Sequence, residues 1–198
     1  MSTDKEKELE QSKENAKPLN IIKEIISMAI YIAVVFLLTY LIITYVGQRT
    51  VVSGSSMEST LSNGDHLILD KISYRFKEPE RFDIIVLPYQ YEENTFYIKR
   101  IIGMPGEKVR IDEKGIIYIN GEELVESYGL EVIDADKLGL AEQEITLSED
   151  EYFVLGDNRN NSSDSRDPSV GNIKREDIIG KAWVRIFPFD KIGFIKHQ

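Results

Sequence analysis

The sequence predicts a mostly β protein: one N-terminal transmembrane helix, followed by an antiparallel β-rich domain. Two observations lead to this fold class. Residues 25–48 contain no charge, and past residue 50 the chain consists of short β-branched and aromatic runs separated by turn residues. Asn120-Gly121, directly after "GIIYI", adds a tight-turn signal. We therefore expect one helix and about 150 residues of sheet, a usual size for a single domain.

Residues 1–24 are polar and rich in charge, as in "STDKEKELEQSKENAK", and they lack apolar periodicity. Such a composition cannot bury enough apolar surface to fold by itself. We expect a largely disordered or loosely helical head.

Residues 25–48 form the predicted transmembrane helix. As a helix they span roughly 36 Å, enough for a hydrocarbon core of about 30 Å. A cleaved signal peptide would be shorter and would end in an A-x-A-like site, which "YVGQRT" lacks. A buried core helix is the other alternative, but a helix that is apolar all round in so small a protein favours lipid contact.

The orientation of this helix follows from its flanking cations. Lys17 and Lys23 precede the helix and Arg49 follows it, which favours a cytoplasmic N-terminus. We expect a single-pass protein of the cell membrane, with a cytoplasmic head (1–24) and an extracytoplasmic β domain (49–198). Seven residues (49–55) separate the predicted helix end from Ser56, so Ser56 would lie near the lipid bilayer.

The predicted strands lie in six runs: "DHLILDKISYRF", "FDIIVLPY", "FYIKRIIG", "EKVRIDEKGIIYING", "EYFVLGD" and "KAWVRIFPF". Residues 126–147 are acidic and irregular, and we interpret them as a loop excursion. No helical periodicity of useful length occurs outside the anchor.

Composition excludes several classes of function. The chain carries 24 Lys+Arg and 34 Asp+Glu, a net charge of −10, which disfavours nucleic-acid binding. It has no cysteine, and its two histidines are His66 and His197. We therefore expect no thiol nucleophile, no metal, no cofactor and no histidine base.

The stretch "VVSGSSMESTL" (51–61) is either a small-residue spacer or the site of a serine nucleophile. A serine needs a base, and a lysine can serve if burial lowers its pKa. Lys99 lies within the apolar run "FYIKRIIGMPG". On a strand, Lys99 and Arg100 point to opposite faces, so one can be inward while the other is solvated. The alternative is that Lys99 is merely an edge-strand charge.

Four motifs occur in order after the helix: "SSMESTL", "RFDIIVL", "YIKRIIGMPGE" and "LGDNRNNSSDSR". In this arrangement the chain resembles the type I signal peptidases, membrane-bound proteases with a Ser/Lys dyad. The resemblance extends to "GKAWVRIFPFDKIGF" and is greatest to the compact Gram-positive form. It implies a catalytic domain of the signal-peptidase type that removes signal peptides from exported preproteins, cleaving after small residues in Ala-x-Ala-like sites.

The resemblance implies the site residues. The nucleophile falls on Ser56, whose backbone N–H would serve the oxyanion hole, and the general base falls on Lys99. Ser55 competes as nucleophile by local chemistry, but the Ser-Met-x-x-Thr-Leu spacing selects Ser56. Ser162 would orient the lysine amine by a hydrogen bond, and Asp164 and Arg166 would form a supporting ion pair.

Other residues of these motifs have less specific interpretations. The turn beside the lysine would be shaped by Gly156, Asp157, Asn158 and Arg159. For Asn160, Asn161 and Ser163 we favour a polar loop with Asx turns. Apolar residues next to the dyad are plausible walls for small substrate side chains, with plain core as the alternative: Val51, Val52, Met57, Leu61, Tyr97 and Ile98.

The chain departs from the family pattern at two positions. It has Ser59 where the family usually has proline, and Phe82 where the family usually has glycine. Neither changes the dyad, so we expect activity. An inactive membrane-tethered binding module is the alternative from a different class. A self-cleaving Ser/Lys repressor lacks support because no helix-turn-helix head is present, and Lys99 argues against the signal peptidases that use histidine.

Overall fold

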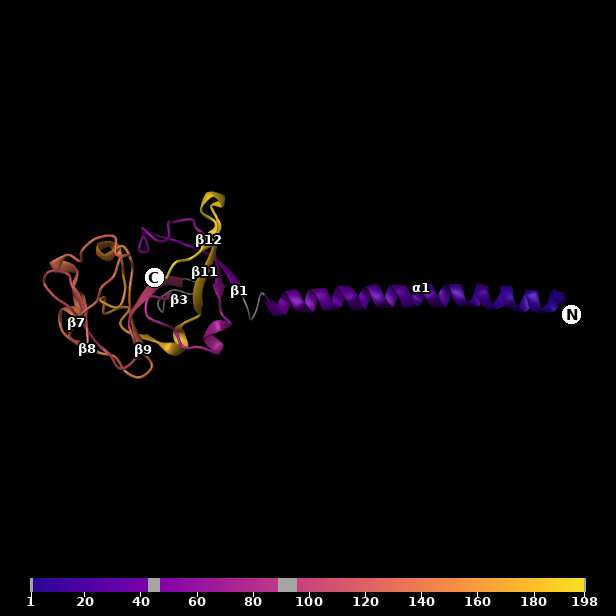
Figure 1. Cartoon of the computed structure of the whole chain (residues 1–198), viewed down its shortest axis with the longest axis horizontal. Coiled ribbons are helices and arrows are strands. Elements are labelled where there is room, and N and C mark those ends of the chain that lie inside the picture. The colour runs from indigo at the N-terminus through magenta and orange to yellow at the C-terminus, as the bar shows by residue number, and fades with distance from the viewer. Residues whose placement is uncertain (1, 43–46, 89–95, 198) are drawn as a thin grey trace. The chain divides into compact units, whose positions relative to one another are not determined.

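The structure, a computed structural model, describes residues 2–42, 47–88 and 96–197, with side chains in the long helix described from Ile22 onward. It divides into two units, residues 1–45 and 46–198. The first is helical and the second consists of antiparallel sheets (Figure 1). The predicted fold class, one N-terminal helix followed by an antiparallel β-rich domain, is confirmed.

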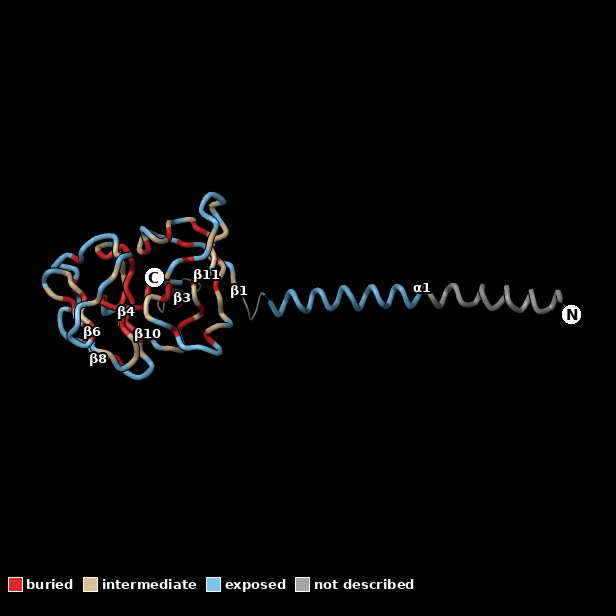
Figure 2. Tube along the Cα trace, in the orientation of Figure 1, coloured by how far each residue is buried: buried red, intermediate tan, exposed pale blue. Residues whose placement is uncertain are grey.

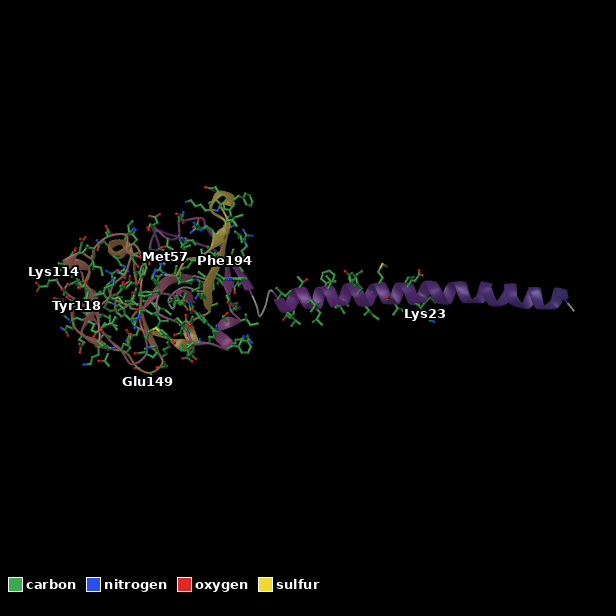
Figure 3. The ribbon with its side chains drawn as sticks, viewed as in Figure 1. Lys23, Met57, Lys114, Tyr118, Glu149 and Phe194 are labelled. Atoms are coloured by element: carbon green, nitrogen blue, oxygen red, sulfur yellow. The ribbon has the colours of Figure 1, made fainter. Side chains whose placement is uncertain are left out.

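Helix α1 spans Ser2–Leu41. Its part from Ile22 to Leu41 is long and apolar enough to cross a membrane, with a mean hydropathy of 2.1 and no buried side chains (Figure 3). The head, for which we expected a largely disordered or loosely helical state, is helical and continuous with this helix from Ser2. Its Lys, Glu, Gln and Ala residues have high helix propensity, so the helix can extend without an apolar stripe.

The helix does not reach the predicted end at Gln48. Strand β1 begins at Gly47 and pairs with β2 from Gly47↔Asp70 to Val51↔His66. Pairing with β2 satisfies the backbone groups of these residues, and Thr50 and Val51 are β-branched and favour a strand. Residues 43–46, at the end of the predicted span, lie outside the described residues.

The larger sheet is antiparallel, with strand order β1-β2-β11-β3-β4-β9-β10 and β12 paired to β11. Its strands are β1 (Gly47–Val51), β2 (His66–Asp70), β3 (Ile84–Pro88), β4 (Phe96–Gly103), β9 (Glu151–Leu155), β10 (Ile173–Lys174), β11 (Gly180–Phe187) and β12 (Gly193–Phe194). Short 3-10 helices occur at η2 (Ser73–Arg75), η5 (Arg159–Asn161), η6 (Arg175–Asp177) and η7 (Phe189–Lys191).

The smaller sheet has strand order β7-β6-β5-β8. Its strands are β5 (Lys108–Ile111), β6 (Ile117–Ile119), β7 (Glu122–Glu123) and β8 (Ile145–Thr146). Asn120 and Gly121 join β6 to β7 with φ of 53° and 87°, so the predicted tight turn is present.

The segment 126–147 differs from the loop excursion that we expected. It contains η3 (Ala135–Lys137), η4 (Gly139–Glu142) and β8, and it supplies Ile133, Leu138, Ala141 and Leu147 to a buried cluster with the smaller sheet. These apolar side chains lack a strand or helix period, so only their packing reveals them as core.

Strand β4 lies inside the larger sheet, between β3 and β9, and Figure 2 colours the trace at β4 as buried. Its residues from Ile98 to Gly103 are all buried. Lys99 is therefore not an edge-strand charge. Arg100 is buried as well, so the expectation that one of these two cations could be solvated is not met.

Candidate functional site

The loop between β1 and β2 holds Ser56 in a closed turn. The N–H of Val52 donates to the Asp65 carbonyl (2.8 Å), and the N–H of Gly64 donates to the Val52 carbonyl (2.9 Å). Met57 is buried beside Ser56. Gly54, at φ +93°, adopts a backbone conformation that favours glycine. The loop thus anchors one side of Ser56 in the core and leaves its hydroxyl free to face a neighbour.

That neighbour is Lys99. Its Nζ lies 2.8 Å from the Ser56 Oγ, and the residue is only 2% exposed. Burial lowers the pKa of Lys99 from 10.5 to about 8; the Arg166 charge adds to this, whereas the Asp164 carboxylate opposes it. A lysine with such a pKa is partly neutral near physiological pH, and neutral Nζ can take the Ser56 proton.

Ser55 faces a different partner. Its Oγ accepts a hydrogen bond from Asn161 Nδ2 (2.9 Å), and its carbonyl accepts one from Asn158 Nδ2 (3.1 Å). Ser56, rather than Ser55, is therefore the serine that meets the buried amine. Ser56 is also the serine that the motif spacing selects, and its role as nucleophile stays a prediction.

Ser162 differs from its expected arrangement. Its Oγ is buried, but it has no hydrogen-bond partner among the described residues, so the expected bond to the lysine is absent. It packs instead against Gly156: a Cβ at residue 156 would lie 2.3 Å from Ser162 Oγ and 2.4 Å from the Ser56 carbonyl oxygen. The missing side chain of Gly156 lets these two groups approach each other.

Asp164 and Arg166 form the expected ion pair. Arg166 Nε lies 2.8 Å from Asp164 Oδ1, and its Nη2 lies 2.9 Å from Oδ2. The same carboxylate accepts the Gly156 N–H (3.1 Å), and Arg166 Nη2 also donates to the Arg159 carbonyl (2.5 Å). The pair is buried and holds the turn that carries Gly156 against the Ser56 loop.

Asn158 and Asn161 form specific hydrogen bonds with the loop that carries Ser55 and Ser56. The N–H of Asn158 donates to the Ser56 carbonyl (3.0 Å), and its side chain reaches Ser55. Asn161, for which we favoured a polar loop, also binds Ser55. Their partners lie about a hundred positions earlier in the chain, and no local pattern could identify them.

The backbone N–H of Ser56 donates to no group among the described residues. The carbonyls on either side of it, those of Ser55 and Ser56, both accept hydrogen bonds from Asn158. The peptide is thus held in place while its N–H remains able to bind an oxyanion, as an oxyanion hole requires.

A groove of about 530 Å³ runs over Ser56 and Lys99. Most of the predicted walls line it: Val51, Val52, Met57, Tyr97 and Ile98. Leu61 does not, because it is fully buried in the core behind the loop. Sequence reasoning missed the contribution of Thr50, Phe96, Asn161 and Ser163 to the lining.

Tyr97 forms a further contact with Lys99. Its ring centroid lies 4.8 Å from Lys99 Nζ. An aromatic face attracts an ammonium group, so the ring stabilises the amine once it has taken a proton. No cluster of three or more His, Cys, Asp or Glu residues suited to a metal occurs within the part of the chain that the structure describes.

Comparison with known proteins matches residues 22–187 to the family described as "Signal peptidase, peptidase S26". A probable signal peptidase I-2 of Synechocystis sp. is 40% identical over 157 residues, covering 77% of this chain and 68% of that protein. Signal peptidase I P of Bacillus subtilis subsp. natto is 36% identical over 193 residues, covering 93% and 98%. The crystal structure of a signal peptidase I from Enterococcus faecalis V583 is 37% identical with a TM-score of 0.44, covering 53% of this chain and 97% of that one.

Proposed function

The chain belongs to the signal peptidase family, peptidase S26, and on this premise we propose that Ser56 is its nucleophile and Lys99 its general base. The protein is a membrane-anchored serine peptidase that removes signal peptides from preproteins. The observation that carries the residue assignment is the 2.8 Å contact between Lys99 Nζ and Ser56 Oγ at the floor of the groove.

The reaction begins with neutral Lys99. Its Nζ takes the proton of the Ser56 hydroxyl as the oxygen attacks the scissile carbonyl carbon. The protonated amine then gives this proton to the leaving amine as the C–N bond breaks, which leaves an acyl-enzyme on Ser56. Lys99, neutral again, takes a proton from a water molecule as the water oxygen attacks the acyl carbon. The ester bond to Ser56 then breaks, and the Lys99 ammonium returns the proton to the Ser56 oxygen, which releases the acid and restores the starting site.

The Ser56 backbone N–H stabilises the charge that develops on the carbonyl oxygen. Losing one such donor typically costs about 10²–10³ in turnover. Asn158 keeps this peptide in place through the Ser55 and Ser56 carbonyls, so it is a positioning residue.

The groove accommodates the end of the signal peptide. Its walls next to the dyad are the apolar side chains of Val52, Met57 and Ile98, which suit small apolar substrate side chains. We infer cleavage after a small residue with a second small residue two positions before it.

The substrate reaches the enzyme at a lipid bilayer. The apolar part of α1 anchors the chain, the lysine-containing N-terminal side is cytoplasmic, and residues 49–198 form the extracytoplasmic catalytic domain.

The decisive experiment uses the purified full chain in detergent and a labelled preprotein with an Ala-x-Ala site. The parent should cleave at that site, and Ser56→Ala and Lys99→Ala should not. Ser55→Ala is the matched control, because its hydroxyl does not meet Lys99, and it should retain activity far above that of Ser56→Ala. Lys99→Arg should be inactive although the charge is kept, because a guanidinium does not deprotonate.

The result also separates the peptidase from an inactive binding module. A folded parent that binds several preproteins without cleaving any, and whose binding survives Ser56→Ala, would overturn the proposed chemistry. Wild-type turnover in Lys99→Arg would overturn the Ser56–Lys99 dyad but not the peptidase activity itself.

A further inference from the structure

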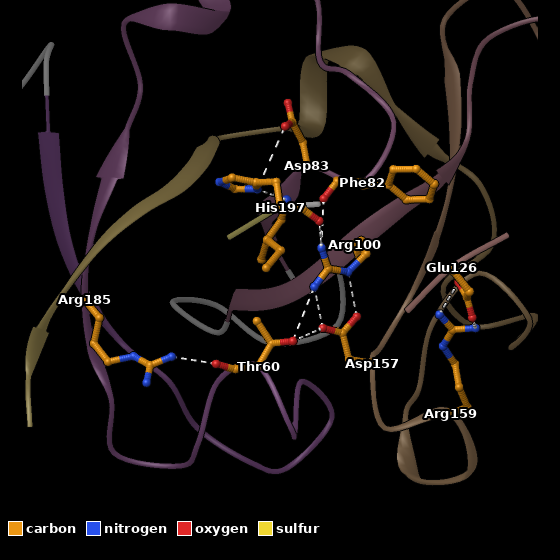
Figure 4. A network of polar contacts seen from close by, with 10 residues as sticks. Thr60, Phe82, Asp83, Arg100, Glu126, Asp157, Arg159, Arg185 and His197 are labelled. Atoms are coloured by element: carbon orange, nitrogen blue, oxygen red, sulfur yellow. Dashed lines mark hydrogen bonds and ion pairs between the residues drawn. The ribbon is translucent and has the colours of Figure 1, made fainter. Parts of the chain in front are cut away.

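Arg100 is buried on the opposite face of β4 from Lys99 and is only 1% exposed. A guanidinium has five N–H donors, and each needs an acceptor when no water is present. Figure 4 shows Arg100 at the centre of a polar network. Its Nε and Nη2 donate to Asp157 (2.8 and 2.6 Å), and Nη2 also donates to Thr60 Oγ1 (3.3 Å). Its Nη1 donates to the Phe82 carbonyl (3.1 Å) and to the His197 carbonyl.

This network reaches the nucleophile from two sides. Thr60 lies in the Ser56 loop, and its hydroxyl donates to Asp157 (2.5 Å). Asp157 directly precedes Asn158, whose N–H holds the Ser56 carbonyl. Arg100 therefore links the loop that carries the nucleophile to the turn that fixes the nucleophile's backbone.

The fifth acceptor comes from a segment distant in sequence, residues 195–197. Ile195 is buried in the same apolar cluster as Val52, Met57 and Leu61, and its N–H donates to the Trp183 carbonyl (2.9 Å). At the other end of the segment, His197 Nδ1 accepts the Ile84 N–H (3.0 Å). Residues 195–197 are thus attached at both ends, and the His197 carbonyl accepts a hydrogen bond from Arg100.

The charge state of His197 suits this attachment. Burial and the charges of Lys181 and Arg100 lower the pKa of His197 to about 4, against the opposing effect of Asp83. The ring is therefore neutral at physiological pH, and its Nδ1 is free to accept a hydrogen bond from the backbone.

We propose that residues 195–197 are a positioning element for the Ser56–Lys99 dyad: the His197 carbonyl completes the coordination of buried Arg100, which fixes Thr60 and Asp157 around the nucleophile loop. This proposal rests on the proposed dyad. Without that carbonyl, one buried N–H of Arg100 has no acceptor, and such a group is costly to bury. Arg100 then shifts toward water or toward its remaining acceptors. Thr60 and Asp157 shift as well, because both accept hydrogen bonds from Arg100.

The test compares three variants of the full chain in detergent. His197→Ala removes the acceptor for the Ile84 N–H and releases the segment. His197→Asn keeps an oxygen close to the position of Nδ1 and should restore the attachment. Lys196→Ala is the matched control, because Lys196 is exposed in the same segment.

We expect kcat of His197→Ala to fall about 10- to 100-fold with little change in KM, since misplacing a reacting group by about 1 Å costs this much. His197→Asn should recover most of the loss, and Lys196→Ala should match the parent. All assays are run well below each variant's Tm, so that a loss of folded protein does not count as a loss of kcat.

A double-mutant cycle tests the route through Arg100. Thr60→Val removes the hydroxyl that meets Arg100, and combining it with His197→Ala should cost less than the product of the two single effects. Wild-type kcat in His197→Ala, an equal loss in His197→Asn, or strictly multiplicative effects would overturn the proposal. If the parent cleaves and neither Ser56→Ala nor Lys99→Ala does, the dyad stands whatever the His197 variants do.

Discussion

At the scale of single residues, two neighbouring cations on one strand have opposite surroundings. Lys99 Nζ meets a neutral hydroxyl and an aromatic ring, whereas Arg100 has an acceptor for each of its donors, two of them on a carboxylate. Desolvation without a charged hydrogen-bond partner lowers the pKa of the lysine. The arginine keeps its charge beside the Asp157 carboxylate, with which it forms a buried ion pair. The same depth of burial therefore leaves one cation with a lowered pKa beside a hydroxyl and holds the other in an ion pair.

The first prediction concerns pH. Since the pKa of Lys99 is about 8, the amine is mostly protonated below this pH and cannot accept the Ser56 proton. We expect kcat/KM to fall about tenfold per pH unit below the pKa and to level off above it. A pH–rate profile with a fluorogenic Ala-x-Ala peptide, between about pH 6 and about pH 10, measures this. A flat profile over that range would contradict a lysine base.

The second prediction concerns Gly156. A Cβ at this position would overlap the Ser162 Oγ and the Ser56 carbonyl, at 2.3 and 2.4 Å. Gly156→Ala should therefore displace the nucleophile and lower kcat by about 10²-fold, with a loss of roughly 1–3 kcal/mol in the free energy of unfolding. Gly193→Ala is the matched control, because a Cβ there meets nothing within 4 Å. Equal activities of the two variants would show that the close approach at Gly156 is unimportant.

At the scale of elements, the site depends on how three segments are placed in the larger sheet and its loops. The β1–β2 loop supplies Ser56, β4 supplies Lys99, and the turn after β9 supplies Asn158. Strand β4 pairs with β9 at Arg100↔Leu155, and this pairing brings the turn beside the cations. Sheet pairing thus places the strand that carries Lys99 beside the turn that carries Asn158, whose N–H donates to the Ser56 carbonyl.

The third prediction concerns the turn before β3, where Phe82 has a φ of +72°. Its ring packs against Tyr128 (5.3 Å between centroids), which in turn covers Arg100. Phe82→Ala keeps the unfavourable backbone and loses the ring contact, whereas Phe82→Gly loses the contact but relieves the backbone. We expect Phe82→Gly to be more stable than Phe82→Ala by about 1 kcal/mol in urea unfolding. Equal stabilities would mean that the backbone conformation at this turn carries no cost.

At the scale of the whole molecule, the helix and the β unit have different sources of stability. All three buried apolar clusters lie within residues 46–198, and α1 contributes to none of them among the described side chains. The apolar surface of α1 is stabilised by lipid or detergent instead.

The fourth prediction follows from this separation. A fragment of residues 46–198 should unfold in one cooperative transition with a Tm within a few degrees of that of the β unit in the full chain. Differential scanning calorimetry of both proteins in the same detergent measures this. A non-cooperative transition in the fragment would show that the β unit needs residues 1–45 to fold.

Much of this protein could be derived from the sequence alone. The apolar helix, the antiparallel strands and the Asn120-Gly121 turn follow from hydrophobic period and turn chemistry, which depend on neighbouring residues. The motif order led to Ser56, Lys99 and the Asp164–Arg166 pair. Errors arose where local composition was a poor guide, at the strand that begins at Gly47 and in the buried segment 126–147.

Only the tertiary structure decided which groups meet. Ser56 and Lys99 are 43 positions apart, Ser55 and Asn161 are 106 apart, and Arg100 and His197 are 97 apart. The burial of Arg100, the missing partner of Ser162 and the position of Leu61 behind the groove are likewise products of packing. Sequence patterns report the environment of a residue relative to its own strand or helix. The identity of its partners depends on how distant strands pair, and that pairing is settled by the fold as a whole.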